Sequence, residues 1–209
     1  MWQYGFPILL IISNTVFFYK LRKWNIETTP VSKVLFFREE SLTCKSHTEV
    51  KPYTIFCTLP TCQFSYITHI LNNINSSKKS LDIVLYMMTI KSLADAIIRA
   101  QRRGVKVRFI ADETMANSSG SKVRFLQCAG IPVRSRPSIY LMHHKFAIVD
   151  DYLLMTGSFN WTLQAAIGNW DNMIITTEID YVRSHKQEFN RLWDDLGIFL
   201  NEEYGATIQ

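Results

Sequence analysis

The sequence has little glycine and proline, and it lacks the compositional biases that prevent folding. Eight glycines and six prolines in 209 residues are too few for a collagen-like or low-complexity chain. Hydrophobic residues make up 47% of the chain and charged residues 20%, which excludes an intrinsically disordered protein. A chain of this length forms one ordinary domain with short additions, and it can bury a core without disulfides.

Charge of either sign is absent from the first nineteen residues, and Lys20, Arg22 and Lys23 follow at once. Nineteen residues form a helix of roughly 28 Å, about the thickness of a hydrocarbon core. We therefore predict a membrane anchor with a basic flank over 1–23. The positive-inside rule leaves the body of the protein in the cytosol. A buried helix or a cleaved signal peptide is the alternative, although a signal peptide carries its positive charge before the apolar run.

Cysteine is scarce, and three of the four cysteines lie in one short window that also holds a histidine. The window contains Cys44, His47, Cys57 and Cys62. Three thiolates and one imidazole form a closed tetrahedral set suited to structural zinc. We predict a zinc element over 44–62 after a linker at 24–43, with buried cysteines or a disulfide as the alternative. The remaining cysteine, Cys128, is expected in the core.

From residue 63 onward, apolar strand-like runs alternate with amphipathic helical patterns. Strands are expected at 80–90, 105–112, 131–137, 140–150, 152–157 and 172–178, with a further one beginning near 35–40, and helices at 64–75, 92–104, 122–129 and 179–196. We expect Ser92 to cap its helix and the Asp150-Asp151 turn to close a hairpin. The alternation predicts an α/β fold over 63–209, in which helices cover both faces of a mixed sheet.

The segment with chemical significance runs from 143 to 162. Its fixed positions are His143, Lys145, Asp150, Gly157, Ser158 and Asn160. In a strand, side chains two residues apart share a face, which pairs an imidazole with an ammonium and turns His144 away. The hydroxyl of Ser158 and the amide of Asn160, which follow the hairpin, are also two residues apart. Together these groups predict a phosphate pocket with His143 as the reacting group.

This spacing resembles the HxK(x)4D(x)6GSxN signature of the phospholipase D superfamily, with every motif position filled. The resemblance implies that His143 attacks phosphorus and forms a phosphohistidine, while a second motif histidine protonates the leaving oxygen. It implies no catalytic metal and a supporting role for Asp150. It also implies that Asp171, eleven residues after Asn160, accepts a hydrogen bond from the nucleophile. Many small members have the longer Glu there, and a turn residue is the alternative for Asp171.

The chain contains only one such motif, whereas the implied mechanism needs two histidines. No other histidine is followed by Lys and Asp at the required distances. The simplest completion is a symmetric homodimer whose two motifs face each other across the axis.

An anchor, a Cys/His zinc element and a single motif together resemble the mitochondrial phospholipase D, or Zucchini, family. That resemblance implies a single-pass protein of the outer mitochondrial membrane with its catalytic domain in the cytosol, although the sequence fits the endoplasmic reticulum as well. It implies two substrates: single-stranded RNA, cut during maturation of piwi-interacting RNAs, and cardiolipin, hydrolysed to phosphatidic acid. A non-enzymatic membrane scaffold is a distant alternative.

Local charge favours the endoribonuclease. Between Arg102 and Arg136 eight basic residues accompany two acidic ones, an excess of six where the whole chain has an excess of five. Basic side chains on two strands of this stretch are expected to line a groove for a polyanion. No aromatic stacking platform is evident near them. An apolar mouth beside the site would instead suit a lipid, and Tyr140, Leu141 and Met142 directly precede His143.

Overall fold

The computed structural model describes residues 31–38 and 62–196. The predicted anchor at 1–23 and most of the predicted zinc element lie outside these residues. Within them, no helix has both the length and the hydropathy needed to cross a bilayer.

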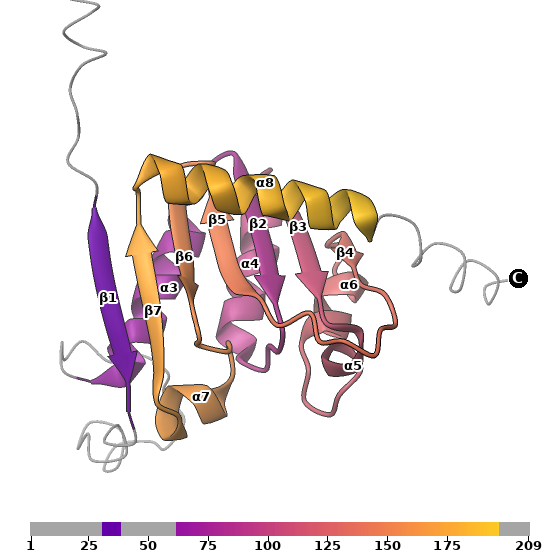
Figure 1. Cartoon of the computed structure of the whole chain (residues 1–209), viewed down its shortest axis with the longest axis horizontal. Helices are drawn as coiled ribbons and strands as arrows, with labels where there is room; N and C mark the ends of the chain where they lie inside the picture. Colours follow the sequence, from indigo (N-terminus) through magenta and orange to yellow (C-terminus); the bar gives the residue numbers. More distant parts are fainter. Residues whose placement is uncertain (1–30, 39–61, 197–209) are drawn as a thin grey trace, which may run out of the picture. The chain divides into compact units, whose positions relative to one another are not determined.

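A seven-stranded mixed sheet forms the centre of the fold (Figure 1). Its strands, in spatial order, are β1 (Ser32–Phe37), β7 (Asp171–Thr176), β6 (Leu153–Gly157), β5 (Lys145–Val149), β2 (Ser80–Leu85), β3 (Lys106–Ala111) and β4 (Val133–Arg134). The pairs β2–β3 and β3–β4 are parallel, and the other four pairs are antiparallel. The central strands are buried on both faces, which explains why they read as continuous apolar runs.

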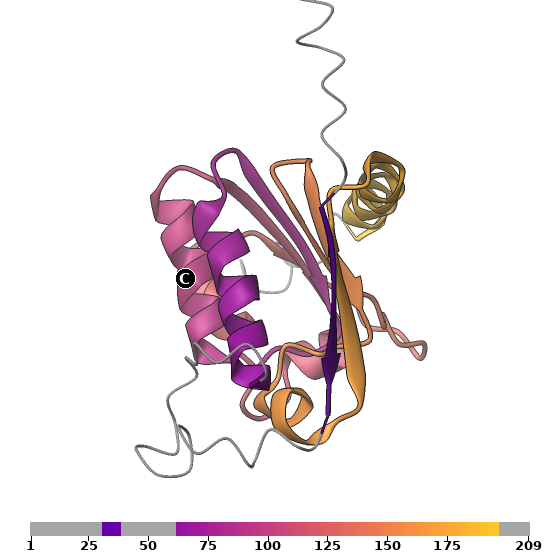
Figure 2. The same ribbon diagram turned by 90° about the vertical axis from the view of Figure 1, so that its left-hand side faces the viewer.

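Helices cover both faces, as the sequence predicts. They are α3 (Gln63–Ser76), α4 (Lys91–Arg102), α5 (Glu113–Ala116), α6 (Val123–Cys128), α7 (Leu163–Gly168) and α8 (Ile179–Asp195). Figure 2 shows α3 and α4 on one side of the sheet and α8 on the other. The main hydrophobic cluster lies under α3 and α4, and a smaller cluster that includes Val182 and Phe189 lies under α8.

The predicted hairpin is confirmed. Strands β5 and β6 pair antiparallel, and Asp150 and Asp151 between them both have φ of 56°. Two consecutive residues in this left-handed region are typical of the tight turn that matches the twist of paired strands. Asp tolerates such angles better than most side chains.

Three strands are clearly shorter than predicted. Strand β2 ends at Leu85 rather than 90, and β5 begins at Lys145 rather than 140. Strand β4 spans only Val133–Arg134 of the predicted 131–137. The apolar residues beyond β2 are buried by tertiary packing, because Met88 bridges to Trp161 instead of extending the strand. Burial explains their hydrophobicity equally well, so periodicity alone placed the strand end wrongly.

Three further details differ from the sequence prediction. Helix α4 begins at Lys91, so Ser92 lies inside it and is not the cap. Cys128 is the last residue of α6 and is exposed, not part of the core. Helix α7 was not predicted; Thr162 caps it by accepting a hydrogen bond from the backbone N–H of Ala165.

Strand β1 lies in the segment predicted to be a linker, where a strand was also expected to begin near 35–40; it begins earlier, at Ser32. It pairs with β7 along its whole length and buries Leu35 and Phe37 in the main core. The folded domain therefore includes a strand that precedes the predicted zinc element in the chain.

Candidate active site

The two halves of the motif meet at one edge of the sheet, the lower edge in Figure 1. Strand β5 begins there at Lys145, and β6 ends there at Gly157. Antiparallel pairing of these strands, with Phe146 opposite Thr156, fixes this meeting. Strands β2 and β3 also end at this edge, and β7 begins there, so five strands contribute to the site.

Lys145 is a buried cation, with 7% of its surface exposed. Its Nζ donates a hydrogen bond of 2.7 Å to the backbone carbonyl of His143 and lies 5.0 Å from the centroid of the Tyr86 ring. Burial lowers the pKa of Lys145, and the charge of Asp171 partly opposes that shift. A buried ammonium with one neutral hydrogen-bond partner is well suited to pair with an anion that enters the site.

His143 lies just before β5 and is exposed. Strand alternation therefore does not orient it, contrary to the sequence argument. Its ring instead packs edge-on against Tyr86, with centroids 4.6 Å apart. The pKa of His143 is lowered, chiefly by partial burial and then by the charge of Lys145. A lower pKa favours the neutral imidazole, which is the nucleophilic form.

His144 points to the opposite side, towards α8. Its ring lies 5.8 Å from that of Phe146, and its Nε2 is 3.7 Å from a carboxylate oxygen of Glu188. Of the two adjacent histidines, only His143 is directed at the site edge.

Asp112, directly after β3, is a site residue that the sequence analysis missed. It is 6% exposed, and its two carboxylate oxygens accept hydrogen bonds from the backbone N–H groups of Met115 at 3.0 Å and Met142 at 3.1 Å. It thereby links α5 to the loop that carries His143, and its charge raises the pKa of that histidine. The available signal was an acidic residue at the carboxyl end of a buried strand.

Ser158 and Asp171 form a bonded pair. The Ser158 hydroxyl donates to Asp171 at 2.7 Å and accepts from the backbone N–H of Asn172 at 3.0 Å. The Asp171 carboxylate also accepts from the side-chain amide of Asn169 at 3.2 Å. Among the described residues, Asp171 thus bonds Ser158 and Asn169 and makes no hydrogen bond to His143.

Asn160 has an uncommitted side chain. Its Oδ1 is buried yet has no hydrogen-bond partner among the described residues. Buried polar atoms are nearly always paired, so a free amide at the end of the motif is a natural contact for a ligand. It completes a set of an imidazole, an ammonium and an amide at one edge.

Asp150 is not brought to this edge. It lies at the opposite end of β5, about 16 Å from the start of that strand at 3.3 Å per residue. Its carboxylate accepts hydrogen bonds of 2.7 to 3.1 Å from the backbone N–H groups of Lys78, Lys79 and Ser80. These bonds hold the pKa of Asp150 below its ordinary value. The structure thus places Asp150 away from His143 and Lys145, where it fastens the hairpin to the start of β2.

The predicted zinc ligands cannot be located as a set. Cys44, His47 and Cys57 lie outside the described residues, whereas Cys62 is buried at the start of α3. Among residues 31–38 and 62–196, no group of three or more His, Cys, Asp or Glu side chains is placed to hold a metal ion.

Half of the predicted basic groove is used for internal contacts, whereas Lys106 and Arg136 are exposed. Arg108 donates two hydrogen bonds to the buried carboxylate of Asp82, at 2.7 and 2.8 Å, and lies over the ring of Phe189. Arg134 lies over the Trp193 ring and donates to the backbone carbonyl of that residue. These two guanidinium groups hold α8 on the sheet and do not line a groove.

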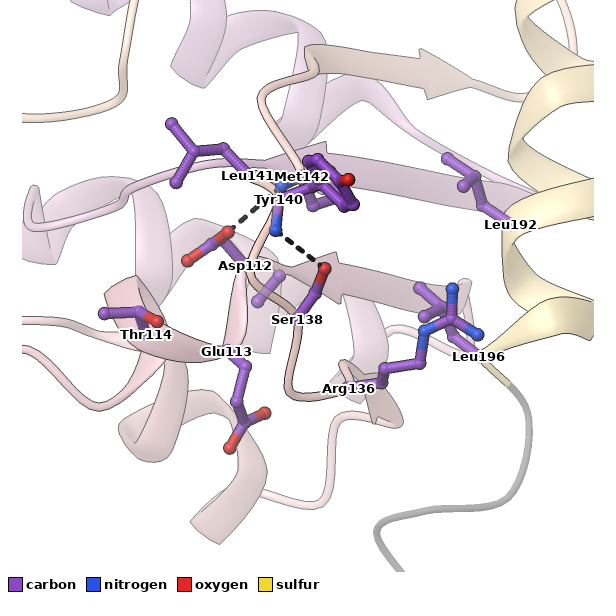
Figure 3. A pocket seen from close by; sticks show the side chains of 11 residues that line it. Asp112, Glu113, Thr114, Arg136, Ser138, Tyr140, Leu141, Met142, Leu192 and Leu196 are labelled. Carbon is purple, nitrogen blue, oxygen red and sulfur yellow. Dashed lines mark hydrogen bonds between the residues drawn. The ribbon is translucent and has the colours of Figure 1, made fainter.

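A pocket of about 230 Å³ opens beside the site (Figure 3). Its apolar lining comes from Leu141 and Met142 of the loop before His143 and from Leu192 and Leu196 at the end of α8. Its polar lining includes Asp112 and Arg136. The loop also carries Tyr140, 78% exposed, so an exposed aromatic side chain does lie near the basic residues, contrary to expectation.

A mixed sheet with one histidine–lysine–asparagine set at its edge defines a phospholipase D-like protein. The sequence model of the family described as "Cardiolipin synthase, PLD-like domain" matches residues 70–193. The chain belongs to this superfamily and, within it, to the family of mitochondrial cardiolipin hydrolases.

Two curated relatives support this assignment, and one solved structure shows the same fold. The mitochondrial cardiolipin hydrolase of Chlamydomonas reinhardtii is 34% identical over 168 residues, which cover 78% of this chain and 74% of the relative. That of Xenopus tropicalis is 36% identical over 166 residues, 79% of this chain and 78% of the relative. Nuc from Salmonella typhimurium, a phospholipase D family member, superposes with a TM-score of 0.61 at 23% identity, covering 79% of this chain and 95% of Nuc. This likeness shows the fold.

Proposed function

We propose that the protein is a phosphodiesterase that acts through a phosphohistidine at His143. One observation carries this proposal: an exposed imidazole of lowered pKa stands beside the buried ammonium of Lys145. The first group is a neutral nucleophile, and the second is a fixed positive charge for the non-bridging oxygens, on which charge develops during displacement. The side-chain Nδ2 of Asn160, whose Oδ1 has no partner among the described residues, would add a donor for the same oxygens.

The reaction divides into two displacements. His143 attacks phosphorus, so that a P–N bond forms and the P–O bond to the leaving group breaks, while a second histidine gives its proton to the departing oxygen. Water then attacks the phosphohistidine, loses a proton to that second histidine and breaks the P–N bond. The ammonium of Lys145 disfavours a divalent cation at the same position, so we expect turnover without an added metal.

The second histidine comes from another copy of the chain in this proposal. Among the described residues, His144 faces α8. Neither His69 nor His185 is the first residue of a His-x-Lys pattern. In a symmetric dimer the partner copy carries the same motif and so supplies a second His143.

Cardiolipin is the substrate that the structure favours. The relatives are named for its hydrolysis, and the loop before the nucleophile exposes consecutive apolar side chains, with Ile139 at 90%, Tyr140 at 78% and Leu141 at 62%. Exposed apolar side chains on one loop are typical of contact with a lipid or protein surface. Hydrolysis would release phosphatidic acid, and the site would act at the mitochondrial outer membrane.

Single-stranded RNA remains the second candidate. Arg136 is exposed and lines the pocket. Tyr140 on the same loop offers a ring on which a base can stack. The use of Arg108 and Arg134 in internal contacts weakens the argument from a basic groove, on which the preference for RNA rested. We therefore place endonucleolytic cutting of piwi-interacting RNA precursors behind cardiolipin hydrolysis.

The remaining parts of the proposal concern segments outside the described residues. A structural zinc held by Cys44, His47, Cys57 and Cys62 would stabilise the segment before α3 and take no part in the chemistry. An anchor over 1–23 would hold the catalytic domain at the cytosolic side of the membrane. Elemental analysis of the purified protein for one zinc per chain tests the first, and carbonate extraction from membranes tests the second.

The decisive experiment compares both substrates with one preparation. Purified full-length protein is incubated with cardiolipin vesicles and with single-stranded RNA, in EDTA, beside a His143→Ala control. We expect phosphatidic acid from the vesicles with wild type only. Turnover of RNA alone would reverse the substrate order. Trapped label on any side chain other than His143 would disprove the mechanism.

A further inference from the structure

The pocket beside the nucleophile contains a cation with no partner among residues 31–38 and 62–196. The guanidinium of Arg136 makes no hydrogen bond and no ion pair with any described residue. This distinguishes it from Arg108 and Arg134, which are engaged with α8. Arginine offers five donors in a planar fork that matches two phosphate oxygens.

The carboxylates of the pocket do not neutralise this cation. Asp112 is committed to two backbone N–H groups, as described above. Glu113 accepts from the side chains of Asn117, at 2.9 Å, and Ser135. Figure 3 shows the Glu113 side chain turned away from that of Arg136. Among the described residues, Arg136 is therefore a cation of the pocket with open hydrogen-bonding capacity.

Two lining residues of the pocket lie next to the reacting histidine, which does not itself line it. Met142 lines the pocket and directly precedes His143 in the chain. Asp112, another lining residue, raises the pKa of that histidine through its charge. A volume of about 230 Å³ is smaller than that of a drug-sized site and suits a headgroup fragment. The walls from Leu192 and Leu196 are apolar and suit the adjoining part of an amphiphile.

We propose that this pocket binds the second phosphate of a diester lipid that carries two phosphates joined by one glycerol, and that Arg136 is the residue that selects such a lipid. This rests on the proposed function, because one phosphate must be attacked at His143 while the other meets Arg136. Cardiolipin has this arrangement, whereas phosphatidylglycerol has one phosphate. Arg136 is a specificity residue here and takes no part in bond breaking.

The test is a ratio of two rates. Full-length wild type and Arg136→Gln are assayed on vesicles of cardiolipin and of phosphatidylglycerol at equal surface charge, with Arg124→Gln as the matched control. Arg124 is an exposed arginine of α6 that does not line the pocket. A charge-assisted contact to phosphate corresponds to a preference of roughly 10- to 100-fold in kcat/KM. We expect Arg136→Gln to lose that preference by lowering the rate on cardiolipin alone.

The outcomes separate this inference from the proposed function. Equal losses on both lipids in Arg136→Gln, or equal losses of preference in both variants, would overturn the role of Arg136 while leaving lipid hydrolysis intact. If the wild-type protein hydrolysed neither lipid, the proposed function itself would be overturned. Circular dichroism melting of each variant verifies that the fold is retained, and Arg136→Lys, which keeps the charge, should recover part of the preference.

Discussion

The carboxylate of Asp112 holds the backbone N–H of Met142 at 3.1 Å, one residue before the nucleophile. The same carboxylate caps α5 through Met115. A buried acid at the end of β3 thus fixes the loop that carries His143 and also influences the charge of its ring. We regard Asp112 as a positioning residue, since its carboxylate is bonded to the backbone N–H groups of Met115 and Met142.

Replacing Asp112 with Asn should shift the pH profile. The charge of Asp112 raises the pKa of His143, so its removal lowers that pKa and the neutral nucleophile persists to lower pH. We expect the acid limb of kcat/KM to move to lower pH, measured with a chromogenic aryl phosphodiester. One carbonyl oxygen cannot replace two carboxylate oxygens, so stability should fall by roughly 1 kcal/mol. Glu113→Gln is the control, and an unchanged acid limb in Asp112→Asn would refute this role.

The two adjacent histidines should differ sharply. We expect His143→Ala to lose activity by about 10³-fold or more, because the covalent step has no nucleophile. His144→Ala should retain most activity, since His144 contacts Phe146 and Glu188 on the other side. Turnover of the aryl phosphodiester measures both. A larger loss in His144→Ala would mean that the nucleophile is misassigned.

Mixed dimers test whether two chains share one site. Wild type and His143→Ala are co-expressed with different tags in equal amounts, and total activity is compared with that of wild type alone. If each site needs both histidines, random pairing leaves about one quarter of the wild-type activity, whereas independent sites leave about one half. Full activity from a strictly monomeric preparation would contradict the shared site.

Asp150 should matter for stability and not directly for chemistry. Asp150→Ala removes the acceptor of three backbone N–H groups and should destabilise the fold by about 1–3 kcal/mol, measured by urea unfolding. Because the folded state lowers the pKa of this carboxyl, its contribution is complete above about pH 4 and is lost as the pH falls through the folded value. Asp150→Asn, which tolerates positive φ, should cost less. Lost turnover in a fully stable Asp150→Ala would point to a catalytic role instead.

Gly157 should not accept a side chain. A Cβ there would lie 2.2 Å from the backbone oxygen of Asn172, the same oxygen that accepts from the N–H groups of Ser158 and Phe159. Gly157→Ala should therefore destabilise the fold by roughly 2 kcal/mol or more and displace the Ser158–Asp171 pair. Gly168→Ala, which meets only the flexible side chain of Gln164, should be tolerated. Equal melting temperatures of the two variants would contradict this close approach.

The sequence predicted those features that rest on local pattern. The Asp150–Asp151 hairpin and the alternation of strands and helices follow from turn chemistry and periodicity, and the motif identified His143 and Lys145 before their surroundings were known. Strand ends were predicted poorly, because Met88 is buried outside a strand while Tyr140 and Leu141 are exposed in a loop. Periodicity cannot separate these situations.

The parts that could not be predicted depend on long-range contacts. Nothing local to Arg108 reveals that Asp82, on the neighbouring strand, and Phe189, on α8, will engage it. Likewise, the role of Asp112 appears only when the chain returns to place Met142 above it. Counting basic residues along the chain therefore overstated the charge available to a polyanion.

The place of β1 limits how the protein can be shortened for laboratory work. Phe37 of β1 stacks on Phe159 at 3.9 Å, directly beside Asn160, and β1 covers the hydrogen-bonding edge of β7. A version trimmed to remove only the amino-terminal hydrophobic residues should start no later than Val31. Trimming as far as residue 44 would expose the unpaired edge of β7, which favours aggregation. It would also remove the Phe37 ring that packs on Phe159 next to Asn160. Such a preparation should therefore be less soluble and less active than the full-length protein.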